Sequence, residues 1–227
     1  MNPLPPIKNN LISRCILLIF IISGCTRLVP MEVPHYEPYP IFRSGAVGIY
    51  MSPELEKYKI SYNPKNDCSL NIYFCSFYTY VYPLGERFRS ILHKVTKSMF
   101  KDIYIYDSLE KFEHDYQDGK FQYILSVQSL EGDIKISTKR ESWRCYQLLF
   151  DLAPQGMPLV SSCRIKAVLA SRKKQNGKVF SIPLEAKASE KIITPSLSCD
   201  KQYFTSTANQ AFSQIASDYA QMISHVF

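Results

Sequence analysis

The residues Ile22-Ser23-Gly24-Cys25 place a nucleophilic thiol behind two small residues, at the end of the most apolar run of the chain. That run, Cys15 to Ile22, has eight residues, whereas a bilayer-spanning helix needs about 20. Lys8 and Arg14 precede it, and no acidic residue precedes or interrupts it. A basic start, an apolar centre and small residues at the exit are typical of a secretory signal. The sequence therefore predicts an exported protein with a signal peptide over residues 1–24.

The same four residues resemble the lipobox of bacterial lipoprotein precursors, in which an aliphatic residue and two small residues precede a cysteine. The resemblance implies that the signal peptidase recognises Ile22, Ser23 and Gly24, and that a diacylglyceryl group is attached to the thiol of Cys25. Several acyl chains hold a protein on a membrane almost permanently. The alternatives are an uncleaved signal anchor and an ordinary secreted protein with a chance cysteine.

The residue after the cysteine, Thr26, bears on the destination. In lipoproteins of enterobacteria, an aspartate at this position retains the protein in the inner membrane, and other residues permit export to the outer membrane. The resemblance therefore implies a lipid-anchored protein on the periplasmic face of a Gram-negative outer membrane.

The composition restricts the partners. Removal of Lys8 and Arg14 with the signal leaves 25 Lys and Arg against 20 Asp and Glu, a balance of about +5. Such a modest excess in a periplasmic protein does not indicate nucleic acid. We expect the outer membrane, through the acyl chains, and other envelope proteins as partners, with an anionic glycan or lipid as a further candidate. The remaining length suits one domain with a sizeable core.

Five cysteines remain besides Cys25, and an odd number leaves at least one thiol unpaired within the chain. Cys145 and Cys163 lie symmetrically about a turn-like segment, so a hairpin of residues 143–150 and 159–170 would let them form a disulfide. Two buried free thiols are the alternative. The spacing of Cys and His predicts no metal site and no cofactor.

The mature chain divides into a tether and a domain. Residues 25–45 contain four prolines, at 30, 34, 38 and 40, which favour an extended spacer. The segment from 46 to 227 is predicted to form a single periplasmic domain. Apolar residues at 88, 91, 92, 95 and 99 indicate one amphipathic helix, and residues 206–227 indicate another.

Strand patterns surround these helices, at residues 46–52, 70–83, 102–108, 121–138 and 142–152. Asn176-Gly177 predicts a further hairpin over residues 163–189, and residues 109–117 fit a short polar helix. Two amphipathic helices need a sheet on which to bury their apolar faces. We therefore expect a two-layer α+β fold, a mostly antiparallel sheet with both helices on one face.

The order of these elements resembles that of several small outer-membrane lipoproteins: the lipopolysaccharide-assembly, curli-secretion and peptidoglycan-synthase-activator lipoproteins. The matching segments are "VGIYMSPEL" and "YPLGERFRSIL…MFKDIYIYDS". The resemblance covers residues 46–227 as element order and carries over no functional residue. It implies a non-catalytic protein within an envelope assembly or transport machine.

Motifs that would indicate catalysis are not found. The sequence contains no GxSxG, HExxH, P-loop or dinucleotide-binding glycine pattern. The four histidines, His35, His93, His114 and His225, have no partner that is evident from the sequence, and the acidic residues between 107 and 115 fit a hydrated face. We therefore expect no enzymatic activity.

An aromatic strand over residues 70–83 is the first candidate binding surface. Its aromatic side chains occupy both faces: Tyr73, Phe74, Phe77, Tyr78, Tyr80 and Tyr82. Such a strand is either the centre of the sheet or a strand that pairs with a partner chain.

A basic face is the second candidate. It combines one side of the first helix with a hairpin tip, and its cations are Arg87, Arg89, Lys94, Lys97, Lys101, Arg172, Lys173 and Lys174. The alternatives are a solvated face and an anion-binding surface.

Together these features predict a structural or accessory subunit of an envelope assembly, secretion or transport complex. Tethering would raise its effective concentration for partners at the membrane. One rival function is a carrier or chaperone for an amphiphile such as lipopolysaccharide, and another is a cell-wall synthesis regulator or hydrolase.

Overall fold

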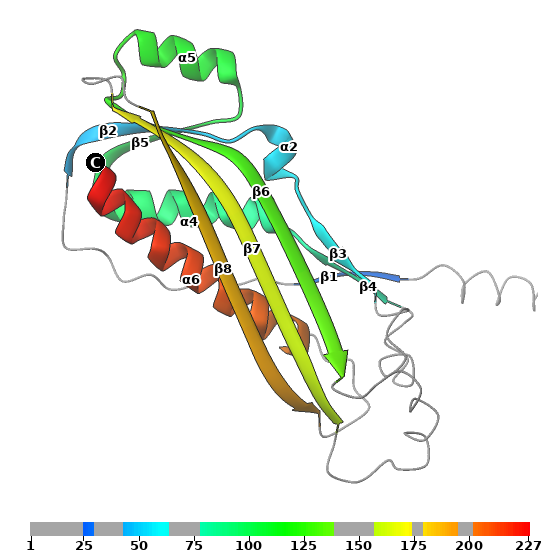
Figure 1. Ribbon diagram of the computed structural model, residues 1–227. Helices are drawn as coiled ribbons and strands as arrows, with labels where there is room; N and C mark the ends of the chain where they lie inside the picture. The colour runs from blue at the N-terminus through cyan, green and yellow to red at the C-terminus, as the bar shows by residue number, and fades with distance from the viewer. Residues whose placement is uncertain (1–24, 30–42, 64–77, 139–156, 174–178, 195–201) are drawn as a thin grey trace, which may run out of the picture.

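The computed structural model describes residues 25–29, 43–63, 78–138, 157–173, 179–194 and 202–227. The elements are β1 (Cys25–Leu28), β2 (Arg43–Tyr50), α2 (Pro53–Glu56), β3 (Ile60–Tyr62), β4 (Tyr78–Tyr82), α4 (Leu84–Met99), β5 (Phe100–Tyr106), α5 (Leu109–Gln117), β6 (Tyr123–Thr138), β7 (Met157–Lys173), β8 (Val179–Thr194) and α6 (Gln202–Val226). Figure 1 shows a long, curved sheet with α4 and α6 across one side and α5 at one end. Among the described residues, no helix has the length and apolar character that a membrane span requires.

The larger sheet has the order β5-β2-β6-β7-β8 and combines two kinds of pairing. Strands β6, β7 and β8 form long antiparallel ladders, in which β7 and β8 are the predicted hairpin. Strand β2, by contrast, runs parallel to both β5 and β6. The expectation of a mostly antiparallel sheet is therefore wrong for the β5-β2-β6 half. Parallel neighbours need crossover connections, and here the chain crosses through α4 before β5 and through α5 before β6.

Helices α4 and α6 share one core with one face of the sheet, as expected for the two amphipathic helices. In α6 the buried residues recur every three to four positions, the spacing of a helix with one apolar face: Ala208, Ala211, Phe212, Ile215, Ala216, Tyr219, Ala220 and Ile223. A buried hydrogen bond of 2.8 Å joins the Thr96 and Tyr219 hydroxyls and connects the two helices. Val47 and Ile49 of β2 face this core.

The opposite face of β2 contacts α5. Ala46 belongs to a second core cluster, in which Phe112 of α5, Phe121 and Tyr106 pack together. This end of the molecule therefore has three layers, α5, the sheet and the α4–α6 pair, rather than the expected two. The side-chain alternation of β2 separates the two cores, because successive residues of a strand point to opposite faces.

A small sheet of order β1-β4-β3 packs beside the large one. Strand β1 runs parallel to β4, and β3 runs antiparallel to β4. Residues Cys25–Leu28, expected in the tether, thus form a strand of the folded domain. The described part of the predicted aromatic strand is β4, and the described part of the second helix begins at Gln202.

Candidate functional site

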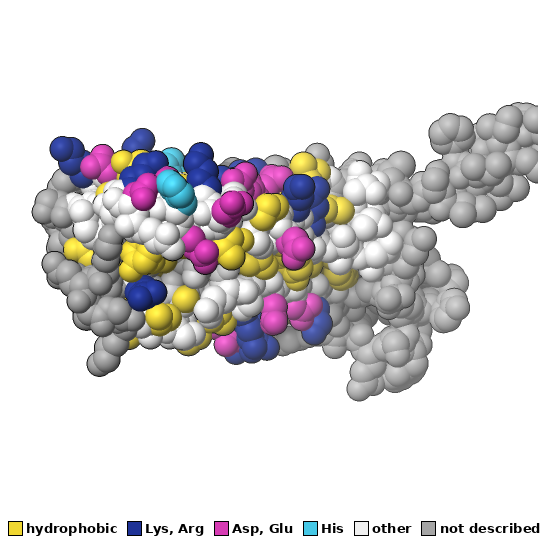
Figure 2. Space-filling model, turned by 90° about the horizontal axis from the view of Figure 1, so that it is seen from above, with side chains coloured by type: hydrophobic (Ala, Val, Ile, Leu, Met, Phe, Trp, Pro, Cys, Tyr) yellow, Lys and Arg dark blue, Asp and Glu magenta, His cyan; other side chains and the backbone are white. Residues whose placement is uncertain are grey.

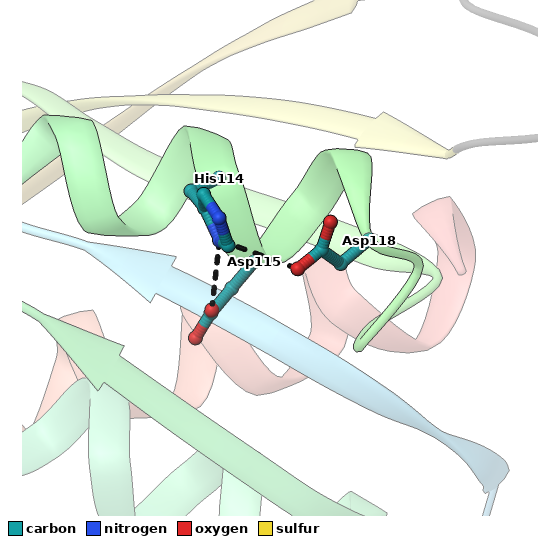
Figure 3. A group of neighbouring side chains, drawn as sticks. All are labelled: His114, Asp115 and Asp118. Atoms are coloured by element: carbon teal, nitrogen blue, oxygen red, sulfur yellow. Dashed lines mark ion pairs between the residues drawn. The ribbon is translucent and has the colours of Figure 1, made fainter.

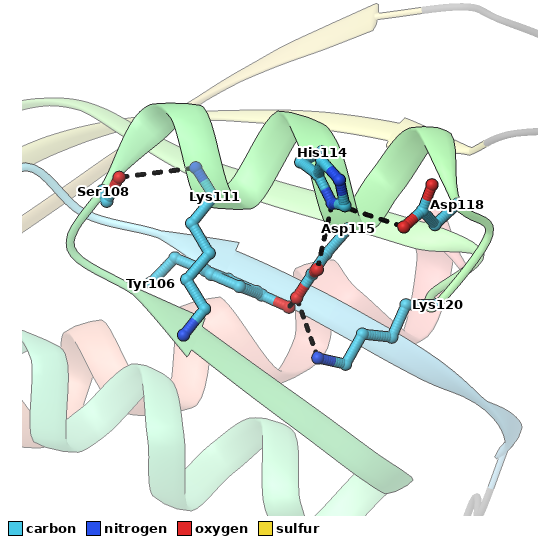
Figure 4. A network of polar contacts seen from close by, with 7 residues as sticks. All are labelled: Tyr106, Ser108, Lys111, His114, Asp115, Asp118 and Lys120. Carbon is cyan, nitrogen blue, oxygen red and sulfur yellow. Dashed lines mark hydrogen bonds and ion pairs between the residues drawn. The ribbon is translucent and has the colours of Figure 1, made fainter.

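Helix α5 presents the densest polar network of the described residues (Figure 4). The Ser108 hydroxyl accepts a hydrogen bond of 3.4 Å from the backbone N–H of Lys111 and caps the first turn. At the other end, Gly119 adopts a left-handed conformation with φ of 76°, which favours glycine. That turn lets the backbone N–H of Lys120 donate to the Asp115 carbonyl at 3.0 Å. The chain therefore returns over its own helix and brings Lys120 beside Asp115.

The Asp115 carboxylate is the centre of this network. Its Oδ2 accepts hydrogen bonds from Lys120 Nζ at 2.8 Å and from the Tyr106 hydroxyl at 2.7 Å. These two donors, Lys120 first and Tyr106 second, lower the pKa of the carboxyl to about 2. Burial and the same hydrogen bond raise the pKa of Tyr106, and Asp115 raises that of Lys120. The network thus joins the end of β5 to α5, and both pKa shifts favour the charged forms of Asp115 and Lys120.

His114 approaches two carboxylates, as Figure 3 shows. Its Nδ1 lies 3.6 Å from Asp115 Oδ1 and 3.3 Å from Asp118 Oδ2. The ligand atoms of the three side chains lie within 4.8 Å of one another, close enough to surround a cation. The Lys120 ammonium, however, already holds one of the carboxylates and would repel a divalent ion. The arrangement is better explained as an ion-pair network on an exposed helix than as a metal centre.

An aromatic cluster packs beside the polar network. Phe121 stacks on Phe112 with ring centroids 5.4 Å apart, and Tyr104 lies 6.3 Å from Phe121. Lys120 Nζ stands 4.8 Å from the centre of the Tyr104 ring, a cation–π contact. Figure 2, in which α5 lies toward the viewer, shows cations and anions interspersed rather than gathered by sign. This surface therefore carries charges of both signs beside an aromatic cluster.

Cys25, the expected lipidation site, is the first residue of β1 and is paired with Tyr78. The recognition residues Ile22, Ser23 and Gly24 lie outside the described residues, as does Cys145.

Of the aromatic strand, Tyr73, Phe74 and Phe77 also lie outside the described residues, and Tyr78 opens β4. Tyr80 and Tyr82 are fully buried in the main core. Strand β4 is paired on both sides, with β1 and with β3, so this part of the aromatic segment is a central strand. A partner chain therefore has no free edge to pair with at Tyr80 and Val81, where β4 has a register partner on both sides.

Cys163 is a free, buried thiol in β7. Its register partners are Ile134 on β6 and Ala188 on β8, so both sides of this strand are occupied. The predicted hairpin of residues 143–150 with 159–170 is consequently wrong at Cys163, and the geometric reason for a disulfide with Cys145 is lost. Burial raises the pKa of the Cys163 thiol to about 12.

The predicted basic face is divided between two sides of the sheet. Arg89 forms an ion pair with Glu56, and Arg87 is half-buried. Lys94 and Lys97 are exposed on α4, and Lys101 is exposed near the start of β5. Arg172 instead lies 5.8 Å from the Tyr116 ring on the α5 side. The side chains of Lys173 and Lys174 lie outside the described residues.

The central position of Asp115 was not expected from the sequence. The acidic residues from 107 to 115 were expected to form one hydrated face, although the Asp115 side chain is only 16% exposed. The signal was Gly119-Lys120 directly after a short helix, since a glycine in that place turns the chain back. Lys120 would then come within reach of the last helical turn.

No protein-family model matches this chain, and no curated protein matches it significantly. Among solved structures, a homologue of neuraminyllactose-binding hemagglutinin from Helicobacter pylori aligns with 86% of this chain and 91% of its own, at 8% identity and a TM-score of 0.47. A PelC dodecamer from Paraburkholderia phytofirmans aligns with 82% and 92%, at 11% identity and a TM-score of 0.32. Likenesses this weak assign no function to the chain.

Proposed function

We propose that this protein is a lipid-anchored lipoprotein of the outer membrane that serves as a non-catalytic accessory subunit of an envelope assembly, secretion or transport complex. The observation that carries the proposal is the sequence Ile22-Ser23-Gly24-Cys25 at the end of a short apolar run with basic residues before it. The position of Cys25 is compatible with it. The residue that would receive the lipid is also the first residue of β1, so a mature chain starting there contains every described element.

Three exposed lysines support binding to an anionic partner. Lys94 and Lys97 lie on α4 and Lys101 follows near the start of β5, and among the described residues none of them forms an ion pair. Other cations are neutralised, for example Arg89 by Glu56 and Lys120 by Asp115. An unpaired group of like charges favours an acidic protein surface, an anionic glycan or a lipid head group.

The chemistry of the polar groups supports a binding role over catalysis. The best-organised carboxylate, Asp115, has a pKa of about 2 and is held by Lys120 and Tyr106. A general acid or base works best with a pKa near the working pH. Asp115 is charged throughout the neutral range and is therefore suited to fixing α5 in place.

Mass spectrometry of the protein from its native host tests the anchor. We expect a mature chain that begins at Cys25 and carries acyl chains, recovered with outer-membrane fractions. The variant Cys25→Ser should remain unprocessed and lose the acyl mass. An unmodified Cys25, or an intact first methionine, would refute the proposal.

In vivo crosslinking and purification in detergent test the partner. We expect wild-type protein to co-purify with other envelope proteins, and the variant K94E/K97E/K101E to lose them or to bind them at least tenfold more weakly. The matched control K57E/K59E/K191E changes the charge equally at exposed positions elsewhere. Recovery of wild-type protein only as a free monomer contradicts a role as a subunit.

A further inference from the structure

The backbone next to Cys25 is fixed to the domain. Cys25 is aligned with Tyr78 and Leu28 with Val81, in parallel register. The Val29 N–H then donates to the Val81 carbonyl at 2.9 Å, and the Val29 side chain is fully buried. Only three residues separate Cys25 from a core residue. The chain therefore has no free spacer between the expected lipid and the folded domain.

The pairing also defines which end of the molecule carries Cys25. Strand β3 runs antiparallel to β4 with Tyr62 opposite Tyr80, so Tyr62 lies toward the Cys25 end of β4. The Tyr62 hydroxyl donates to the Ile136 carbonyl at 3.0 Å. Ile136 is near the end of β6, where the ladder with β7 also ends. Cys25 thus shares an end with the last residues of β6.

Helix α5 lies near the first residues of β6, at the end of that strand opposite Ile136. Tyr123, the first residue of β6, pairs with Val47 of β2, and α5 packs on β2. Between Tyr123 and Ile136 the strand advances thirteen residues, which at ~3.3 Å per residue gives roughly 40 Å. Figure 1 shows β1 away from α5, beside the half of β6 that is farther from α5.

The outer face of β1 carries an apolar side chain. Leu28 is 59% exposed, whereas the other large hydrophobic side chains exposed among the described residues, Leu109, Val179 and Phe180, lie toward the α5 end. Thr26 is exposed on the same face of the strand. An exposed leucine three residues from an acylated cysteine suits contact with the boundary between head groups and acyl chains.

We propose that the domain sits directly on the membrane, with the ends of β1, β3, β4 and β6 against the phospholipid head groups and α5 pointing away from them. This orientation rests on the proposed lipidation of Cys25. The bilayer is the partner, and the surface that contacts it includes Thr26, Leu28, Ser61 and Lys135. The aromatic and ionic surface of α5 then projects into the periplasm, where other proteins can reach it.

Photocrosslinking of the full-length protein in native membranes tests the orientation. A photoreactive amino acid is placed at Ser61 or Lys135, near the anchor, or at Glu113 or Gln117 on α5, all exposed positions. A probe at Thr26 reports lipid contact beside Cys25 itself. We expect lipid adducts from Thr26, Ser61 and Lys135, and at least tenfold fewer from Glu113 and Gln117.

A spacer variant tests whether the fixed connection through β1 sets the orientation, rather than the mere closeness of the domain to the membrane. Twenty Gly and Ser residues inserted between Thr26 and Arg27 form a coil with an end-to-end distance of about 25 Å. We expect lipid adducts at Ser61 to fall several-fold, while Thr26 still gives them.

The outcomes separate this inference from the proposed function. Three outcomes would overturn the orientation while lipidation stands. They are equal adducts from both ends, no adducts at Ser61 and Lys135 despite those at Thr26, and no effect of the spacer. No adducts at Thr26 together with an unmodified Cys25 by mass spectrometry would refute the lipoprotein and, with it, the orientation.

Discussion

The hydroxyl of Tyr106 donates a hydrogen bond of 2.7 Å to Oδ2 of Asp115, and so joins the last residue of β5 to helix α5. The same oxygen accepts from Lys120. Helix α5 is the connection through which the chain passes from β5, across β2, to β6. A charged hydrogen bond therefore holds the crossover that makes the β5-β2-β6 pairing parallel.

The first prediction concerns acid. The pKa of Asp115 is lowered from 3.8 to about 2, so the folded state holds the carboxylate more strongly than the unfolded chain does. The resulting stabilisation is fully present above pH ~4 and is lost as the pH falls toward 2. Carboxyl-carbon NMR should give a midpoint near pH 2 for Asp115. Asp115→Asn should remove this part of the acid dependence of unfolding, and a midpoint at or above 3.8 would contradict the network.

The second prediction concerns the contact between α4 and α6. The Thr96 and Tyr219 hydroxyls are fully buried and 2.8 Å apart. Tyr219→Phe leaves the Thr96 hydroxyl without this partner and should lower the free energy of unfolding by about 1–3 kcal/mol. Thr96→Val combined with Tyr219→Phe should cost less than the sum of the single changes. Urea unfolding measures the cycle, and strict additivity would show that the hydroxyls do not interact.

The third prediction concerns the packing of β2 against the aromatic cluster. A Cβ atom added at Gly48 would overlap the ring of Phe121, which is fully buried. Gly48→Ala should therefore destabilise the fold by about 1–3 kcal/mol. In a Phe121→Leu background the same change should cost less, because the ring that it meets is gone. Equal costs in both backgrounds, measured by urea unfolding, would place the strain elsewhere.

The elements with local signals could be predicted from the sequence. Helix α5 has the expected bounds, 109–117, and the spacing of apolar residues from Phe88 to Met99 located α4. The hairpin of β7 and β8 was also predicted, around Asn176-Gly177. Helical periodicity and hairpin turns depend on residues close in sequence, so one chain is enough to reveal them.

The relations between distant segments could not be predicted in the same way. Nothing local shows that β2 lies between β5 and β6, because strand order depends on which apolar faces bury each other. The same limit applies to Cys163. The sequence predicted a hairpin with residues 143–150, which are close in the chain, whereas its register partners are Ile134 on β6 and Ala188 on β8. In the predicted basic face, Lys94 and Lys97 are exposed, as expected. The ion pair of Arg89 with Glu56 could not be predicted locally, because it joins two separate helices, α4 and α2.

The last prediction concerns Cys163. Its side chain is 3% exposed, and burial raises the pKa of the thiol to about 12, so almost none of it is thiolate at pH 8. Since the thiolate is the nucleophile, iodoacetamide should leave Cys163 unmodified in the folded protein. Addition of urea without a reductant should make it react fully, because the thiol is free. Peptide mass spectrometry distinguishes the states. Labelling in the folded protein would contradict the burial, and resistance to labelling in urea until a reductant is added would reveal a disulfide.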